Sequence, residues 1–569
     1  MPKATRFNLA FLPIVQWLPK YNWKQWLRLD IIAGITLWGV VVPEGIAYAG
    51  LAGMPLQAGL YTILAALVAY AIFGTSKQLV VVSTSASAVM LASIITALNP
   101  PDPGTYLALA GGLILVVGVI FILAGIIKLG FIVNFISRPV MEGFIFGLAI
   151  FVAVKQLPKL FGFARGDGNT LEQLWYLFNH LGQTNILTLA VGLGALILLF
   201  GLHRLSRRIP AGLVVLVLGI LASVVFSLSA AGVHVVGAIP AGLPSFGLPE
   251  VRLRDLWVLL PSALGMVLVI FSEGLGAADV FASKHNYEIK PNQELIAYGA
   301  ANVGSGLLGG LAAGGSLSQS SVNDSAGARS AISLLIAAAM GLITVIALTP
   351  LFTSLPEAVL AALIIHAVIH LMKVRQMQRF YLLQKMEFWL GMIALLGVLI
   401  LDILPGLAIA VLFSLVYIIY RSSQPHVSIL GKVPGAPGAY SDIQRHPEDQ
   451  PVPGLLIFRL AAPLYFANAS LFCNRLKELV GESVPPPRAI VVDMSASDDL
   501  DITSIEMLEN LIKEFKEEHI ELIAAEVHQP VIEMARRSGL AEHFGKAQVF
   551  ATVDAAVQDF LKRYPLQES

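Results

Sequence analysis

Long apolar runs, broken by glycine and proline, fill residues 30–420 and constrain the fold of this chain more than any other feature. Of the 569 residues, 56% are hydrophobic and 13% are charged. A soluble domain carries about a quarter charged residues. Apolar runs of this length and spacing are typical of segments whose solvent is lipid. The sequence therefore predicts an α-helical polytopic membrane protein.

About fourteen candidate spans can be counted, although several are too short or too rich in glycine to cross a bilayer of about 30 Å unaided. An even number of spans places both termini on one side of the membrane. The approximate bounds are 30–50, 58–74, 79–98, 106–127, 131–153, 186–201, 212–229, 258–278, 293–310, 316–327, 331–349, 353–371, 387–402 and 406–420.

Basic residues concentrate in alternate connections between these spans. If the N-terminus is cytoplasmic, the inside connections contain Lys77, Arg138, Lys284 and Lys373, whereas Asp102 lies outside. This distribution follows the positive-inside rule. We therefore expect a bacterial inner or plasma membrane protein with both termini in the cytoplasm.

The composition changes near Arg421, where soluble character begins. We expect a cytoplasmic segment at 1–29, a transmembrane domain at 30–423, a Pro/Gly-rich linker at 424–452 and a compact α/β domain at 453–569. Strand patterns fall at 454–460, 489–494 and 521–525, and helical patterns at 468–480, 505–517, 530–538 and 554–563.

Composition and motifs exclude several classes. The net charge is zero, so nothing favours a nucleic-acid partner. Cys473 is the sole cysteine, so no internal disulfide can form. No catalytic triad, P-loop or metal-ligand cluster stands out, so we expect neither an enzyme nor a cofactor or metal site.

Several ordered motifs resemble one family. Gly-Leu-Tyr-Thr at 59–62, Tyr70 and Gly-Thr-Ser-Lys at 74–77 resemble the signature of the sulphate permease (SulP) family of anion transporters. Segments similar to the first, eighth and tenth spans of that family and to the opening of its STAS domain lie at 42–61, 272–287, 314–329 and 454–468.

The resemblance implies seven plus seven spans in an inverted repeat, in which a core domain moves against a gate domain, as in the related nucleobase transporters. A cytoplasmic α/β STAS domain follows. The resemblance also implies a small anion substrate and a homodimer in the lipid bilayer, with a possible cytoplasmic partner for the STAS domain.

Two stretches rich in Gly, Ser and Thr occupy corresponding places in the two halves, at 83–87 and 314–321. Matched interruptions of this kind indicate the binding site of a transporter. Half-helices that begin near the midplane would point their free N–H groups at an anion. The alternative is helix packing by small residues. The predicted substrate-binding residues are Glu44, Tyr48, Ser83, Thr84, Ser85, Gly315, Ser316, Leu317, Ser318 and Gln319.

Two positions depart from the pattern of the family. Val82-Ser83-Thr84 stands where Gly-Pro and a bulky residue are usual, which predicts a smaller and more hydroxylic pocket wall. Gln319 stands where some members, notably animal ones, carry an arginine that faces the anion. Attraction would then rest on helix dipoles and on protonation, which favours coupled transport over a channel.

Two carboxylates lie at membrane depth, where an ionisable group is costly and suggests function. Glu44 follows Pro43, where many family members have glutamine. Burial favours a neutral carboxyl, so Glu44 could donate to an anion when protonated and repel it when charged. The alternative is a polar substitute for glutamine. Glu273 resembles the acidic residue of the eighth span, and either cation coupling or a structural hydrogen bond fits it.

These observations predict secondary active transport of sulphate, bicarbonate or a dicarboxylate by H⁺ or Na⁺ symport. Glu44 and Glu273 are the expected coupling groups. An uncoupled anion channel or exchanger is one alternative. The other is a signalling protein in which the membrane domain anchors the STAS domain.

Two sets of residues outside the predicted anion site carry expectations of their own. Thr503 and Ser504 stand where bacterial anti-sigma antagonists with this domain are phosphorylated, although simple N-capping by either one is the preferred interpretation. At the end of the tenth span we expect Asp324 and Arg329 to form a structural ion pair or a helix cap.

Overall fold

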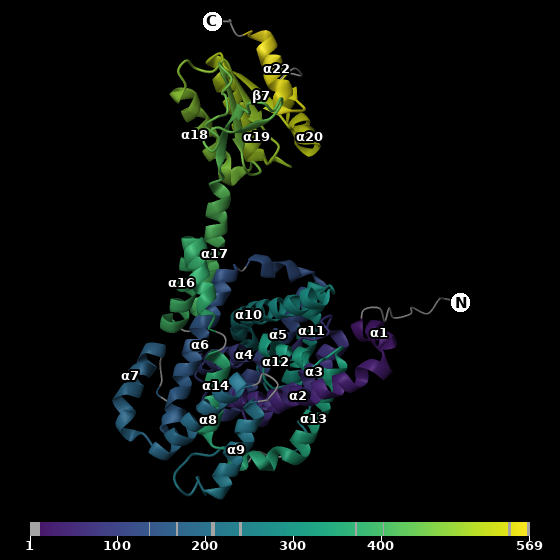
Figure 1. The fold of residues 1–569 in the computed structure, drawn as a ribbon, viewed down its shortest axis with the longest axis vertical. Helices are drawn as coiled ribbons and strands as arrows, with labels where there is room; N and C mark the ends of the chain where they lie inside the picture. The colour runs from purple at the N-terminus through teal and green to yellow at the C-terminus, as the bar shows by residue number, and fades with distance from the viewer. Residues whose placement is uncertain are drawn as a thin grey trace, which may run out of the picture. The chain divides into compact units, whose positions relative to one another are not determined.

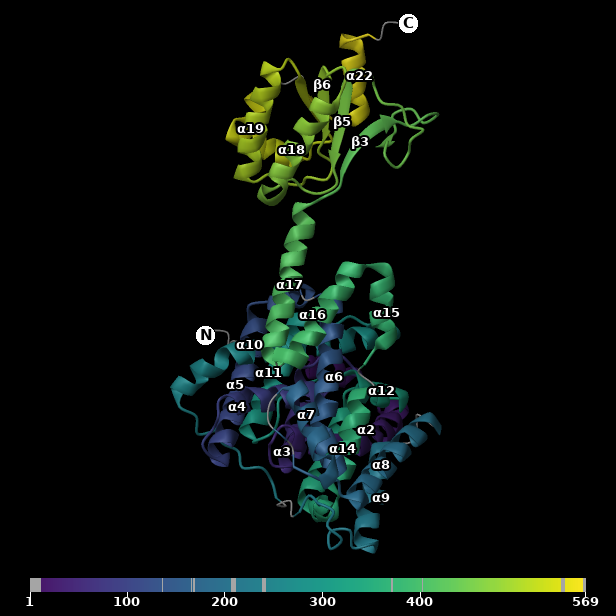
Figure 2. The same cartoon turned by 90° about the vertical axis from the view of Figure 1, so that its left-hand side faces the viewer.

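The structure is a computed structural model that describes residues 12–135, 137–164, 166, 169–205, 211–237, 242–369, 372–401, 403–543 and 548–565. The chain forms two compact units, Met1–Ser414 and Leu415–Ser569, which are treated separately below. Figures 1 and 2 show the elements of each unit.

The first unit is mostly helical. Within the described residues, seven helices are long and apolar enough to cross a membrane, and shorter apolar helices accompany them. The span count of about fourteen stays a prediction. The helices are α1 (Pro13–Trp17), α2 (Trp23–Leu51), α3 (Gln57–Phe73), α4 (Ser85–Ala97), α5 (Pro103–Ile126), α6 (Arg138–Phe161), α7 (Thr170–His180), α8 (Ile186–Leu205), α9 (Ala211–Val225), α10 (Leu253–His285), α11 (Pro291–Leu307), α12 (Leu317–Ser325), α13 (Ile332–Ile343), α14 (Glu357–Ile369), α15 (Val374–Leu383), α16 (Lys385–Leu401) and α17 (Ile403–Ser423), which contains the boundary between the units.

These helices pack in two groups drawn from both halves of the sequence. Helices α2, α3, α5, α10, α11 and α13 contact one another, and α6, α8, α14 and α16 form the second group. Small residues let the backbones meet: a Cβ atom on Gly143 of α6 would lie 2.0 Å from the carbonyl oxygen of Gly391 of α16. The two groups agree with the expected core and gate domains.

Two predicted spans do not begin as helices. The segments at 79–98 and 316–327 start with or follow short strands, β1 (Val80–Ser83) and β2 (Ala313–Ser316). The strands pair antiparallel, with Val80 opposite Ser316 and Ser83 opposite Ala313. β-Branched valines favour the extended form in β1, and each strand supplies the backbone partners that the other needs in a lipid environment. The sequence did not predict these strands, whereas helices fill the rest of both segments, as α4 and α12.

Side chains complete the hydrogen bonding around this ribbon. The buried Asn302 of α11 donates to the carbonyl oxygen of Ala313 and accepts from its N–H, both at 2.9 Å. The Ser320 hydroxyl accepts from the N–H of Val80 at 2.8 Å, and the Ser87 hydroxyl donates to Ala312 at 2.9 Å. Side chains of α4, α11 and α12 therefore all hold the ribbon in place.

The second unit is an α/β domain. Its sheet has the order β4-β3-β5-β6-β7-β8, formed by β3 (Val427–Lys432), β4 (Tyr440–Asp442), β5 (Leu455–Leu460), β6 (Ala489–Asp493), β7 (Glu521–Ala525) and β8 (Val549–Phe550). Strands β5 to β8 are parallel and β3 and β4 are antiparallel additions. The predicted linker at 424–452 thus contributes two strands, which its Pro/Gly-rich composition concealed.

Helices cover both faces of this sheet, as Figure 2 shows. The core on one face joins β5 and β6 to α18 (Phe466–Glu482) and α19 (Ile502–Glu517), with contributions from α20 (Gln529–Ser538) and α21 (Leu540–His543). The core on the other face joins the same strands to α22 (Val553–Arg563). The predicted strands at 454–460, 489–494 and 521–525 and the four predicted helices are all present.

One close contact in the first unit yields a test. A Cβ atom on Gly274 of α10 would lie 2.0 Å from the hydroxyl of the buried Tyr298, whereas a Cβ atom on Gly276 would meet no atom within 4 Å. We predict that Gly274→Ala destabilises the chain by about 1–3 kcal/mol through overpacking. Gly276→Ala, the matched control on the same helix, should be neutral or slightly stabilising. Thermal unfolding of the full chain in detergent measures both, and equal melting temperatures would contradict the contact.

Candidate functional site

Glu44 and Gln319, predicted from different halves of the chain, meet directly. The Gln319 amide nitrogen donates to the Glu44 carboxylate at 2.5 Å. Glu44 lies in α2 directly after Pro43, and Gln319 is buried in the first turn of α12. Tyr48 is buried one turn after Glu44 and is close enough to interact electrostatically with its carboxylate. The Gln319 amide oxygen has no hydrogen-bond partner among the described residues.

The N-terminus of α12 is capped by Ser316, whose hydroxyl accepts from the N–H of Gln319 at 3.4 Å. The Ser316 and Ser318 hydroxyls are 3.1 Å apart. Leu317 and Ser318 are exposed, whereas Gly315 is buried in β2 against Gly274. Ser316, Ser318 and Gln319 therefore share the first turn of α12, where Ser316 caps the N–H of Gln319, and Gly315 lies in the strand directly before this turn.

The third-span residues lie at the other end of the ribbon. Thr84 caps α4, since it accepts from the N–H of Ser87 at 3.1 Å while Ser87 accepts from the N–H of Thr84 at 3.0 Å. Ser85 is buried in the first turn of α4. The buried Ser83 hydroxyl has no partner among the described residues. Because the strands are antiparallel, the N-termini of α4 and α12 leave the ribbon at opposite ends.

Glu273 lies on α10, half-buried, and is close enough to interact electrostatically with the hydroxyls of Tyr48 and Tyr298. No hydrogen bond joins it to another residue in the described ranges. The buried Ser272 and Tyr298 hydroxyls are also without partners there. The structure thus groups Glu44, Tyr48, Glu273 and the start of α12, and it leaves several buried polar atoms unused. Buried polar atoms without partners are rare in finished cores and suit a binding site.

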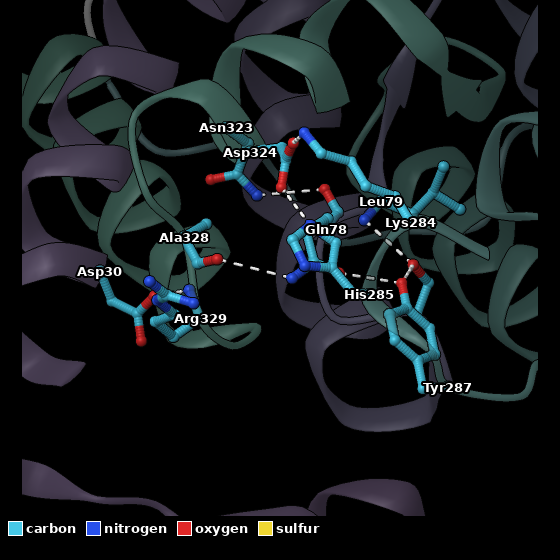
Figure 3. A network of polar contacts seen from close by, with 11 residues as sticks. Asp30, Gln78, Leu79, Lys284, His285, Tyr287, Asn323, Asp324, Ala328 and Arg329 are labelled. Atoms are coloured by element: carbon cyan, nitrogen blue, oxygen red, sulfur yellow. Dashed lines mark hydrogen bonds and ion pairs between the residues drawn. The ribbon is translucent and has the colours of Figure 1, made fainter. Parts of the chain in front are cut away.

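Asp30 is a buried carboxylate that the sequence did not single out. It accepts from the backbone N–H of Arg329 at 2.7 Å, from the hydroxyl of Ser330 at 2.8 Å and from that of Tyr21 at 2.9 Å. It therefore attaches the turn after α12 to the start of α2, as Figure 3 shows for Asp30 and Arg329. The run of apolar residues around it hid this position.

Asp324, at the end of α12, pairs with α10 and not with Arg329. It lies 2.5 Å from the Lys284 nitrogen and 2.6 Å from His285 Nε2 (Figure 3). The predicted Asp324–Arg329 pair was wrong, because Lys284 and His285 of α10 take the Asp324 carboxylate.

Gln78 extends the connections at the end of α12. Its carbonyl oxygen accepts from the Asn323 amide at 3.1 Å, and its side-chain oxygen accepts from the Tyr287 hydroxyl at 2.9 Å. Figure 3 shows these contacts beside Asp324. They join the segment before β1 to α12 and to Tyr287, two residues after the end of α10. Because α12 is so short, this network fixes the far end of the helix whose first turn carries Gln319.

Glu294 of α11, also missed, explains part of the sequence signature. It is fully buried and accepts from the Tyr70 hydroxyl at 2.8 Å and from the N–H and hydroxyl of Thr75 at 2.7 and 2.5 Å. The signature residues Tyr70 and Thr75 therefore hold α3 to α11. Because its carboxylate accepts three hydrogen bonds, Glu294 has a structural role in this domain.

In the second unit, neither predicted capping residue caps α19. The cap is Asp501, whose carboxylate accepts from the N–H of Ser504 at 2.8 Å. Partial burial raises the pKa of Asp501, but hydrogen bonds from Ser504 and from the N–H of Phe466 outweigh it and lower the pKa overall. Ser504 is fully buried, whereas Thr503 is exposed. An acceptor of phosphate at this turn would be Thr503.

Comparison with known proteins covers nearly the whole chain. Residues 27–394 match the sequence profile described as the Sulfate permease family, and residues 446–556 match that of the STAS domain. A probable sulfate transporter of Mycobacterium tuberculosis (strain CDC 1551 / Oshkosh) is 33% identical over 98% of this chain and 100% of its own length.

Two solved structures share the architecture. The murine Solute Carrier 26 family member A9 anion transporter, in the inward-facing state, superposes with a TM-score of 0.90 at 24% identity, over 99% of this chain and 96% of that chain. The transmembrane domain of a cyanobacterial bicarbonate transporter, BicA, gives a TM-score of 0.60 at 25% identity, over 68% of this chain and 96% of its own. The similarity to the murine transporter shows only that the two proteins share a fold.

The contrast between Thr503 and Ser504 is testable. We predict that Ser504→Asp, which places a charge in a fully buried position, destabilises α19 by about 3 kcal/mol. Thr503→Asp, the exposed control near the same helix N-terminus, should change stability by about 0.5 kcal/mol or less. Hydrogen exchange of residues 502–517 in the full chain reports both variants. Equal protection in the two would show that Ser504 is accessible.

Proposed function

Because this chain belongs to the sulfate permease family, we propose that it moves a small oxyanion or carboxylate across the membrane by proton symport. The observation that carries the proposal is the bond between Glu44 and Gln319 at the first turn of α12. It places a carboxylate that can change its charge beside backbone N–H groups that suit an anion.

The proposed cycle depends on the state of Glu44. When Glu44 is ionised, it accepts from the Gln319 amide and repels an incoming anion. When it is protonated, it can donate to the anion, and the Gln319 amide is released to donate as well. Anion and proton then enter together, because each favours the binding of the other.

The anion would rest on the open first turn of α12. The hydroxyls of Ser316 and Ser318 are 3.1 Å apart there and can both turn toward an oxyanion. No lysine or arginine occupies the position that Gln319 takes, so attraction comes from the helix N-terminus and from the proton. Ser83, Thr84 and Ser85 would form the hydroxylic wall beyond the ribbon.

Sulphate, bicarbonate and dicarboxylates all present at least two oxygens to donors, and all remain candidate substrates. The relative from Mycobacterium tuberculosis is named as a probable sulfate transporter and the cyanobacterial structure as a bicarbonate transporter. Those names make sulphate and bicarbonate the first substrates to test. We further propose a homodimer with both termini in the cytoplasm, and a cytoplasmic partner for the STAS domain.

Glu273 offers a second coupling route. Its carboxylate is half-buried, has no hydrogen bond to another described residue and lies near Tyr48. A sodium ion prefers such a carboxylate together with carbonyl and hydroxyl oxygens. Sodium symport through Glu273 is therefore the second candidate. A channel or exchanger, and a membrane-anchored sensor, are outcomes that the following experiments distinguish.

The proton proposal predicts that Glu44→Gln abolishes the stimulation of uptake by an inward proton gradient while the chain still binds the anion. The reason is that glutamine keeps the bond to Gln319 but cannot exchange a proton. Uptake of labelled sulphate and bicarbonate into proteoliposomes measures this. Glu250→Gln, the same change at an exposed carboxylate, should behave as wild type. Undiminished proton stimulation of Glu44→Gln uptake would sink the proposal.

The coupling ion is tested separately with a sodium gradient at equal pH on both sides. We expect no acceleration of uptake in the wild type. Acceleration that disappears in Glu273→Gln would assign coupling to sodium. Steady anion current across planar bilayers without a cation gradient would point to a channel, and inert vesicles with every substrate would favour the sensor.

A further inference from the structure

Helix α15 and the start of α16 expose an unusual amount of apolar surface. Leu382 is 80% exposed and Leu383 is 73% exposed. Four apolar residues of α15, Val374, Met377, Tyr381 and Leu382, face the same way at helical spacing, with Gln378 among them. Apolar surface that faces outward in this manner marks a contact with lipid or with another molecule.

That face forms one wall of a groove. A cavity of about 580 Å³ lies between α6, α15 and α16, lined by Phe146, Leu382, Phe388 and Met392 among others. The lining is almost wholly apolar, and its volume lies within the range of small-molecule sites. None of the predicted anion-site residues lines it. An apolar chain would fit this groove, whereas an anion would find no donor inside it.

Cations stand along the rim of the groove. Arg379 precedes Leu382 by three residues, and Arg375 precedes Arg379 by four, so both lie on the strip of α15 beside the groove. Lys385 begins α16 and lies one turn before Phe388, which lines the groove. All three cations are exposed, and the single carboxylate within 372–401 is Glu387. The Lys373 ammonium forms an ion pair with the Glu142 carboxylate, with Nζ and Oε1 2.9 Å apart.

Aromatic residues cluster beside the groove. Tyr381 contacts Phe388 edge to face with ring centroids 5.2 Å apart, and Phe388 contacts Trp389 at 5.6 Å. Tyr381 and Trp389 are both about half exposed. Tyrosine and tryptophan gather at the membrane–water interface, where basic residues meet lipid headgroups. Tyr381 and Trp389 beside these cations are what a position at headgroup depth would require, in the leaflet that the charge bias predicts to be cytoplasmic.

We propose that this groove binds an anionic phospholipid. One acyl chain lies in the groove between α6, α15 and α16, and the phosphate is held by Arg379 and Lys385, with Arg375 beside them. A second copy of the chain is disfavoured as the occupant. In a two-fold interface the same patch meets itself, and the cations of both copies would face one another. The inference does not depend on the proposed transport function.

Native mass spectrometry of the full chain in mild detergent tests the proposal, with phosphatidylglycerol and phosphatidylcholine as probes. We expect wild type to bind phosphatidylglycerol preferentially. Arg379→Gln combined with Lys385→Gln should reduce that preference roughly 30-fold, as expected when two cations near a headgroup are removed. The control combines Lys128→Gln with Lys290→Gln, two exposed cations elsewhere, and should keep the preference.

A second variant addresses the acyl chain. Met392→Trp fills the groove and should reduce the binding of both lipids at least tenfold while the rim cations stay intact. Unchanged lipid adducts in both kinds of variant would overturn the proposal. So would displacement of the adduct by inorganic phosphate, which would indicate a headgroup-only site. Loss of a dimer, rather than of lipid, in Met392→Trp would identify a second copy as the occupant.

Discussion

The antiparallel pairing of β1 with β2 is the interaction on which the first unit depends. Two segments leave the helical form inside a membrane domain, where water cannot satisfy their backbone groups. Each strand supplies most of the partners for the other. Asn302, Ser87 and Ser320 bind backbone groups around the ribbon. Without this pairing, neither short helix could begin where it does.

The pairing also decides where the site can be. Because the strands are antiparallel and four residues long, the open first turns of α4 and α12 stand at opposite ends of the ribbon. At the α12 end, α2 brings Glu44 to Gln319. The two matched polar stretches therefore differ in their surroundings. One end holds an ionisable group, and the other end holds the hydroxyls of Ser83 to Ser85.

Much of this arrangement could be predicted from the sequence. Apolar runs, the soluble tail and the two polar interruptions are local patterns, and each appears in the structure at the expected place. The strands β1 and β2 were missed because their stability comes from each other, across more than 200 residues. The sequence also did not reveal Asp30, because two of its partners lie about 300 residues away. It did not reveal the Asp501 cap or the strands in 424–452, because these depend on turn geometry.

Four carboxylates of the first unit, Asp30, Glu294, Glu44 and Glu273, differ in how many donors each one holds. Asp30 accepts from three different residues, and Glu294 accepts three times from Tyr70 and Thr75. A group bound so often cannot gain or lose a proton without breaking its surroundings. Glu44 holds Gln319 with Tyr48 beside it, and Glu273 has no hydrogen bond to a described residue. The two proposed coupling groups are therefore held by fewer hydrogen bonds than Asp30 and Glu294 are.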